Sequence, residues 1–541
     1  MKISKRKIQR LMFAVLVCVL LVNTLFVPGS IAGIETANRK IGLLIGCPDA
    51  IVNGVKTRID PNDPNVVPII QDGRTLIPLR FIAECFGVKV EWDEATSTVK
   101  VDLERARVEM VLGNTTVKYN VNTREMDVPA QVIDGRTMVS VRAFADLFDK
   151  YTFWDNRGLI IVSDLNDRDV TDEYIGRFLV HERVAQSDGP SMLPGFYGTT
   201  PESPDGKLVA YLVTENKPGS KEGKKGALYL CDSDLTNHRK IRDISNVNWH
   251  YGSHVVWLDN NTLAYNDNVD GKGLKTYIIN TNGEEVAGPF QGNLGHGDNN
   301  VNSILMYVQR DAYKNGSDLG PPGIYLYNHR DGSVKQVLDV QRDFGPLKEK
   351  FPGSRDDIFT WEMGHVQLSP GGERILIWLG VGGGQDNVKI LSCRVGGSEM
   401  KVFPTKPLHQ QWYDDTTIFA HEVDWENGEY PMYKAKRWDL DGNYIETIAG
   451  VGNHMGISFD RKYYASETQY WTNPVVLRLY RYGNVEPLAI LFAESPGTVW
   501  SVKTHIDPSF SRDSRKVYFN MPVAEDMIQM YRVDFSNLIR D

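Results

Sequence analysis

A mostly β fold in two parts is predicted by three observations on the sequence. The 541 residues include 48 Gly, 26 Pro, 24 Tyr and 11 Trp, a composition that favours many short strands joined by tight turns over a helical bundle. A motif near the N-terminus recurs after 62 residues, and a second, longer period begins at about residue 175. The predicted fold class is a small α+β tandem-repeat domain followed by a seven-bladed β-propeller.

The first 32 residues have the pattern of an export signal. A basic stretch precedes the apolar run Leu11–Val27, and small residues at Ser30 and Ala32 stand where a signal peptidase reads. We expect cleavage after Ala32. The alternative is an uncleaved membrane anchor, since about 17 apolar residues lie at the lower limit for spanning. No second apolar run is long enough to span, so we expect residues 33–541 to lie outside the membrane.

Net charge limits the partners of the exported chain. The expected signal carries five positive and no negative charges, so its removal leaves 55 Lys+Arg against 69 Asp+Glu. Such a chain does not bind nucleic acid or another polyanion through bulk charge, and any acidic ligand needs a local site. The four remaining cysteines show no zinc-type spacing. A bridge between Cys47 and Cys85 is compatible with export, but the sequence does not decide it.

Two units of one pattern follow the signal, over residues 43–103 and 106–164. Residues 71–83 (QDGRTLIPLRFIA) are answered by residues 133–145 (IDGRTMVSVRAFA), and the same offset carries Trp92 onto Trp154. In each unit we expect strands, an Asp-Gly turn, a short amphipathic helix and a strand containing the Trp. The predicted helices span residues 79–86 and 141–148.

These motifs resemble the copper amine oxidase N-terminal-like domain, over residues 41–165. The resemblance implies a stalk module on an exported protein of Gram-positive bacteria, which spaces or attaches its partner domain at the cell wall. Copper chemistry is not expected, because residues 41–165 contain no histidine and Asn443-Tyr444 has Leu440 and Ile445 where the oxidase motif requires Thr and an acidic residue. The chain is therefore not expected to be a copper amine oxidase.

The second part, residues 175–541, has the period of propeller blades. A Ser-Pro-Asp-Gly-type turn followed by an alternating strand recurs at intervals of roughly 42 to 55 residues, which suits one four-stranded blade per repeat. A degenerate copy at residues 299–309 brings the number to seven. Residues 176–185 are expected to pair with the last blade and close the ring. These features resemble TolB-like propellers. Residues 309–361 exceed what a blade needs, and we expect a loop there over one face.

Histidines recur just before the blade turns, and this is the feature that points to function. They are His254, His365, His409, His454 and His505. Equivalent positions in a propeller face the central channel, so these side chains are expected to converge on one axial site. The alternative is that each histidine makes a structural hydrogen bond to the turn of the next blade. A cluster of His with Asp507 suits a divalent cation, manganese more than calcium.

The segments around these histidines resemble the ordered blade motifs of the oligogalacturonate lyase family. The resemblance implies metal-assisted β-elimination on pectin-derived uronates at a manganese site. It implies His454 and His505 as metal ligands, with Asp507 where the family has a third histidine. The glutamine ligand of the family is Val502 here, so a weakened, altered or absent metal site is one expectation.

The same resemblance assigns the candidate catalytic residues His409, Lys389 and His365. His409 matches the base, Lys389 falls where the family has a basic residue facing substrate, and His365 opens the motif HVQLSP. Elimination requires the uronate carboxylate to be neutralised while a neutral His removes the C5 proton.

Two functions therefore follow from the sequence. The first is a lyase-like enzyme acting on acidic oligosaccharide, and the alternative is a non-catalytic propeller that binds cell-wall glycan or protein. Neither involves nucleic acid, nor a membrane after signal cleavage. Five tryptophans near the turns offer a sugar-stacking surface or, alternatively, blade packing: Trp361, Trp412, Trp425, Trp471 and Trp500.

Overall fold

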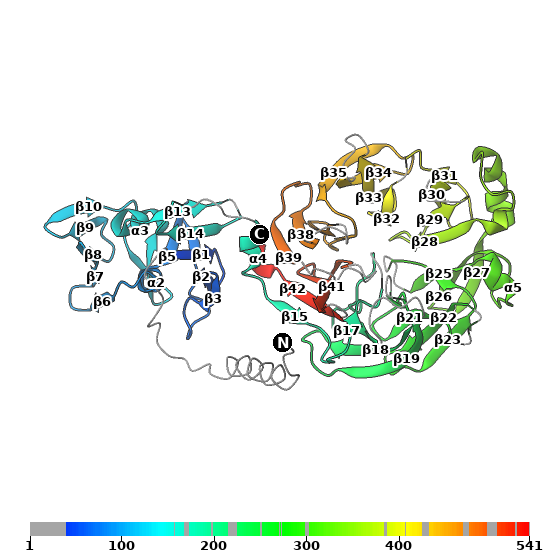
Figure 1. Ribbon diagram of the computed structural model, residues 1–541, viewed down its shortest axis with the longest axis horizontal. Helices are drawn as coiled ribbons and strands as arrows, with labels where there is room; N and C mark the ends of the chain where they lie inside the picture. The colour runs from blue at the N-terminus through cyan, green and yellow to red at the C-terminus, as the bar shows by residue number, and fades with distance from the viewer. Residues whose placement is uncertain are drawn as a thin grey trace, which may run out of the picture.

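The computed structural model is dominated by antiparallel sheets, as the composition predicts (Figure 1). It describes residues 39–155, 157–166, 172–195, 198–214, 224–248, 252–269, 271, 273–297, 302–382, 387–405, 407–424, 432–468, 475–494, 506–524 and 527–539. The expected export signal lies outside these residues. Within them, no helix has the length and apolar character needed to cross a membrane.

The tandem module contains two units with the same order of elements. The first unit is β1 (Lys40–Leu44), β2 (Asp49–Val52), β3 (Val55–Arg58), β4 (Ile69–Gln71), β5 (Arg74–Pro78), α2 (Leu79–Cys85), β6 (Val90–Asp93) and β7 (Thr98–Asp102). The second is β8 (Arg107–Val111), β9 (Thr116–Tyr119), β10 (Asn122–Glu125), β11 (Gln131–Ile133), β12 (Arg136–Ser140), α3 (Val141–Phe148), β13 (Tyr151–Trp154) and β14 (Leu159–Ser163). The two predicted helices are confirmed.

The units exchange their last hairpins. Hairpin β13-β14 of the second unit pairs with β1 of the first, and hairpin β6-β7 of the first pairs with β8 of the second. Between them, β5 and β12 pair symmetrically about Ile77 and Val139. Helices and sheets enclose one shared core, so neither unit buries its apolar residues alone.

The Asp-Gly turns behave as their sequence predicts. Asp72 and Gly73 have φ of 49° and 70°, and Asp134 and Gly135 have φ of 49° and 72°. Two consecutive left-handed residues give the tight hairpin turn whose twist matches the flanking strands. In each unit the turn delivers β5 or β12 directly into its helix.

Residues beyond the module form seven four-stranded sheets, which confirms the seven predicted blades (Figure 1). The first three blades are β16 (Ser191–Met192), β17 (Leu208–Thr214), β18 (Lys224–Asp232) and β19 (Arg239–Val247); β20 (Val256–Trp257), β21 (Thr262–Asp267), β22 (Lys275–Asn280) and β23 (Glu285–Phe290); and β24 (Asn293–Leu294), β25 (Ser303–Val308), β26 (Gly323–Asn328) and β27 (Ser333–Asp339).

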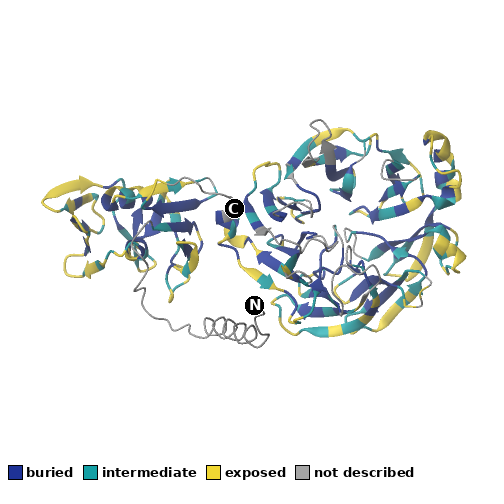
Figure 2. Cartoon of the chain, in the orientation of Figure 1, coloured by how far each residue is buried: buried dark blue, intermediate teal, exposed yellow. Residues whose placement is uncertain are grey.

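The next three blades are β28 (Glu362–Leu368), β29 (Arg374–Gly380), β30 (Val388–Arg394) and β31 (Lys401–Val402); β32 (Leu408–Trp412), β33 (Thr417–Asp424), β34 (Met432–Asp439) and β35 (Tyr444–Val451); and β36 (Met455–Ile457), β37 (Tyr463–Glu467), β38 (Val475–Arg481) and β39 (Ala489–Glu494). Burial falls from the second strand of a blade to the fourth: β21 is buried throughout, whereas β23 is largely exposed (Figure 2).

The seventh blade joins the two ends of the propeller. Its strands are β15 (His181–Arg183), β42 (Met527–Asp534), β41 (Lys516–Ala524) and β40 (Ser509–Phe510). The pairing of β15 with β42 confirms the predicted closure by residues 176–185. Closure satisfies backbone groups that would otherwise form an open sheet edge.

The blade turns are held by a short side-chain hydrogen bond. Ser203 Oγ donates to Asp205 at 2.8 Å, and Ser458 Oγ donates to Asp460 at 2.7 Å. The serine oxygen also accepts the backbone N–H five residues on, for example Leu208 at 3.0 Å. The Ser-x-Asp motif therefore serves the turn itself.

The expectation that residues 309–361 form a loop is wrong, because two regular blade strands, β26 and β27, lie within this range. The extra chain forms a short helix between β25 and β26, α5 (Arg310–Lys314), and three helical turns after β27: η1 (Val340–Phe344), η2 (Gly345–Lys350) and η3 (Ile358–Thr360). Phe344 and Phe351 pack into the core of blades 3 and 4, so the insertion is anchored by apolar contacts.

Module and propeller share a hydrophobic core. Short helix α4 (Asp172–Gly176) packs on β39, and Leu44 and Ile161 of the module cluster with Leu477 of blade 6. A Cβ at Gly176 would lie 1.9 Å from the Ile490 carbonyl oxygen, so this contact requires glycine. The junction is therefore a packed interface.

The four cysteines in the described part of the chain, Cys47, Cys85, Cys231 and Cys393, are buried free thiols. Cys47 lies in the core at the junction and Cys85 in the core of the module. The bridge that the sequence left open is not formed, because the two residues belong to different cores.

Candidate functional site: an axial histidine cluster

Four of the five predicted histidines are described, and each lies in or directly before the innermost strand of a blade. His254 precedes β20, His365 lies in β28, His409 lies in β32 and His454 precedes β36. Asp507 holds the same position before β40, four residues ahead of a blade turn. His505 and Val502 lie outside the described residues.

The structure brings these histidines into two groups and adds one that the sequence analysis missed. His296, just after β24, has its ring centre 4.4 Å from that of His254 and 5.0 Å from that of His365. In the second group the ring centres of His409 and His454 are 4.5 Å apart. His296 escaped notice because its blade has a degenerate turn; its N–H donates to the Val366 carbonyl at 2.7 Å, which ties blade 3 to blade 4.

The backbone is strained at the equivalent positions. His254, His365, His409 and Asp507 have φ of 50°, 47°, 57° and 49°. A left-handed conformation at a residue other than Gly costs on the order of 1 kcal/mol or more and is concentrated at functional sites. The same backbone conformation therefore recurs at the equivalent position of four blades.

Hydrogen bonding fixes the tautomers of the second group. His409 Nδ1 lies 3.1 Å from the carbonyl oxygen of Asn453 in the next blade. A carbonyl only accepts, so Nδ1 carries the proton and the basic lone pair resides on Nε2. His409 is half-buried. The alternative role predicted for these histidines from the sequence is a structural hydrogen bond between blades. Nδ1 of His409 makes such a bond, but its partner is a backbone carbonyl and not a turn side chain.

Glu467 is the acidic residue that the sequence analysis missed. It ends β37, is fully buried, and lies 2.5 Å from His454 Nδ1. Its other oxygen accepts the backbone N–H of Asp507 at 3.1 Å. The carboxylate orients His454 in the way that carboxylates orient metal-bound or catalytic histidines. A lone acid at the end of an otherwise apolar strand was the signal available in the sequence.

Burial controls protonation around the axis. It lowers the pKa of His254 and His365 to about 4 and that of His421 to about 3, so these rings are neutral at physiological pH. Burial, and then the Glu467 charge, raise the pKa of Asp507 well above its usual range. The cluster therefore combines neutral His254, His365 and His421 with the charged Glu467 carboxylate.

A metal centre does not assemble from the described residues. Among them, no three His, Cys, Asp or Glu side chains converge as ligands. Asp507 Oδ1 is 3.8 Å from His454 Nδ1, the ring nitrogen that Glu467 already engages. The described donors therefore do not fit a metal.

The other predicted residues lie in different surroundings. Lys389, in β30, has its ammonium 5.5 Å from the ring centre of Phe351, on the insertion after β27. Trp361 and Trp412 are 4% and 1% exposed and donate to the backbone carbonyls of Arg355 and Gln367. The blade-packing alternative is therefore correct for these two; Trp425, Trp471 and Trp500 lie outside the described residues.

Comparisons with known proteins agree with this architecture. Residues 61–162 match the copper amine oxidase N-terminal domain. No protein of curated function matches the sequence. Among solved structures, an oligogalacturonate lyase from Vibrio parahaemolyticus is 13% identical with a TM-score of 0.46, and covers 71% of this chain and 96% of its own.

Two further structures have lower scores. An oligogalacturonate lyase in complex with manganese is 13% identical with a TM-score of 0.42 over 71% of this chain and 96% of its own. A putative TolB from Agrobacterium tumefaciens is 15% identical with a TM-score of 0.28 over 65% and 92%. The chain thus joins a segment that matches the copper amine oxidase N-terminal domain to seven four-stranded sheets formed by its described residues.

Proposed function

We propose that this is an exported, cell-wall-associated protein that binds acidic oligosaccharide at the axial histidine cluster and cleaves it by β-elimination. The observation that carries the proposal is the His409–His454 pair, with ring centres 4.5 Å apart and Nδ1 of each ring held by an acceptor. Both basic lone pairs then reside on Nε2, the state that proton abstraction requires.

In the proposed reaction His409 Nε2 removes the C5 proton of a uronate. The electron pair forms the C4–C5 double bond, the C4–O bond breaks, and the departing oxygen takes a proton from water, while the C5 proton stays on His409 until it is released to solvent. Removal of this proton requires the charge that develops on the substrate carboxylate to be stabilised. In this proposal Asp507, which is buried and whose pKa burial raises, donates a hydrogen bond there as a neutral acid.

The test is the ultraviolet absorbance of unsaturated product from the protein beginning at Gly33. Oligogalacturonate and other uronic oligomers are supplied with and without added manganese. We expect a rise that is lost in His409→Ala and kept in His329→Ala, a histidine held by Asp259 at a blade turn. Manganese dependence would implicate His505 as a ligand. No rise with any uronate, from a folded protein, would refute the lyase.

A second function, recognition of acidic glycan without cleavage, is favoured by the burial of His454 and Asp507, which are 1% and 2% exposed, and by the hydrogen bond that holds His454 on Glu467. It predicts saturable binding of oligogalacturonate without unsaturated product. His409→Ala would then weaken binding and leave the absorbance flat.

A further inference from the structure

A groove in the tandem module, separate from the propeller axis, has the character of a ligand site. It encloses about 640 Å³ between α2, the loop after β3, the β11-β12 turn and strand β6. Such a volume falls within the usual range for small-ligand pockets. Strand β6 lies on the side of the module that faces away from the propeller (Figure 1).

One wall of this groove is the loop after β3, which is longer than the equivalent loop of the second unit. Strands before the loop are offset by 67 residues between the units, as for Lys40 and Arg107, whereas strands after it are offset by 62, as for Ile69 and Gln131. The first unit therefore has five additional residues here. The longer loop supplies Asp60, Asn62 and Val66 to the groove wall.

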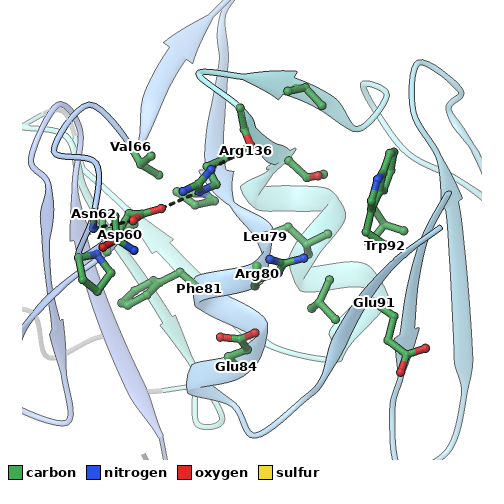
Figure 3. A pocket seen from close by; sticks show the side chains of 18 residues that line it. Asp60, Asn62, Val66, Leu79, Arg80, Phe81, Glu84, Glu91, Trp92 and Arg136 are labelled. Atoms are coloured by element: carbon green, nitrogen blue, oxygen red, sulfur yellow. Dashed lines mark hydrogen bonds and ion pairs between the residues drawn. The ribbon is translucent and has the colours of Figure 1, made fainter. Parts of the chain in front are cut away.

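An exposed aromatic face forms the opposite wall. Trp92, on edge strand β6, is 44% exposed, and Phe81 of α2 also lines the groove (Figure 3). An indole in such a position offers an apolar plane to a ring that carries C–H groups on one face.

Polar groups around the indole are of both signs. Asp60 accepts from Arg136 Nε at 2.6 Å, and the backbone N–H of Asn62, followed by Arg136, lowers the pKa of Asp60. Arg80 and Glu84 lie one helical turn apart on α2, and no described residue is within ion-pair distance of either (Figure 3). The groove therefore offers donors and acceptors without an excess of positive charge.

We propose that this groove binds a neutral polysaccharide chain, with a sugar ring stacked on Trp92 and its hydroxyls bonded by Arg80, Glu84 and Asn62. Hydroxyl groups both donate and accept, which matches a lining with free groups of both signs. An acidic glycan would meet Asp60, Glu84 and Glu91 against two guanidinium groups, so its carboxylates are disfavoured there. The module and the propeller would then hold different parts of a wall polysaccharide.

The second unit supplies a matched control. Trp154 occupies the equivalent strand and is 50% exposed, but the loop before β11 is five residues shorter than the loop that carries Asp60 and Asn62. Both tryptophans are exposed, so replacement of either by Ala leaves the core unchanged.

The experiment is native electrophoresis of the protein beginning at Gly33 in gels that contain galactomannan, xylan, β-glucan or polygalacturonate. We expect at least one neutral polymer to retard the protein. Trp92→Ala weakens this interaction by at least about tenfold, whereas Trp154→Ala stays within about twofold of the parent protein. Circular dichroism of both variants checks that they are folded.

Three results would overturn the proposal: no retardation by any neutral polymer, equal loss in the two Trp variants, or retardation that a wall-derived peptide abolishes and neutral sugars do not. Retardation by polygalacturonate alone would assign binding to the propeller. His409→Ala separates the two proposals, because it acts on uronate elimination and leaves Trp92-dependent retardation intact.

Discussion

Acid should destabilise this propeller through its buried histidines, and His254 gives the clearest measure. An unfolded His has a pKa of about 6.5, whereas burial lowers that of folded His254 to about 4. As the pH falls through this interval the unfolded state takes up the proton and the folded state does not. The stability contributed at neutral pH is thus lost between about pH 6.5 and pH 4.

The loss of unfolding free energy follows from how far the pH lies below the pKa of the unfolded histidine. At about pH 5, some 1.5 pH units below the unfolded pKa, the loss is about 2 kcal/mol for His254. His254→Asn removes this titration and keeps a residue that tolerates the left-handed backbone at φ 50°. The fall in unfolding free energy between about pH 7 and pH 5 should therefore be about 2 kcal/mol smaller in the variant.

Urea unfolding followed by near-ultraviolet circular dichroism measures this difference. The comparison at about pH 8, where both states are neutral, gives the effect of the substitution itself and is subtracted. His421→Gln should show a similar change, because burial lowers the pKa of His421 to about 3. If parent and variant lose the same free energy on acidification, within about 0.5 kcal/mol, the assignment of a buried neutral His254 is wrong.

Two substitutions test the carboxylate that holds His454 and the glycine at the junction between module and propeller. Glu467→Gln places an amide N–H₂ against either His454 Nδ1–H or the Asp507 N–H, so we expect a loss of about 1–3 kcal/mol in unfolding free energy at neutral pH; an unchanged value would contradict the donor assignment. Gly176→Ala forces a Cβ onto the Ile490 carbonyl and should lower the thermal midpoint by several degrees, whereas Gly345→Ala, with its nearest contact at 3.7 Å, should not.

The repeats made most of the fold predictable. The 62-residue offset located both helices and both Asp-Gly turns, because a turn needing left-handed backbone restricts which residues occur there. The blade turns gave the seven sheets and the closing strand, because period-2 alternation and Ser-Asp turns are local. The prediction for residues 309–361 was wrong because blade 3 has a degenerate turn. Without that turn motif, the sequence did not mark β26 and β27 as blade strands.

Local patterns could not reveal which units share a sheet or which side chains meet. The exchange of hairpins between the two units depends on pairings between residues more than 100 positions apart, such as Lys40 with Ser163. The same limit hid Glu467, whose partner His454 lies across a strand turn, and His296, which meets His365 through a contact between blades.

The sequence by itself determined the architecture, the positions of the histidines relative to the blade turns and the equivalence of Trp92 with Trp154. Tertiary structure alone decided that Cys47 and Cys85 lie in separate cores, that His409 donates to a carbonyl of the next blade and that one of two equivalent tryptophans faces a groove. The physical reason is range: turns and strand alternation are set within a few residues, whereas protonation, burial and pocket shape depend on neighbours brought together by folding.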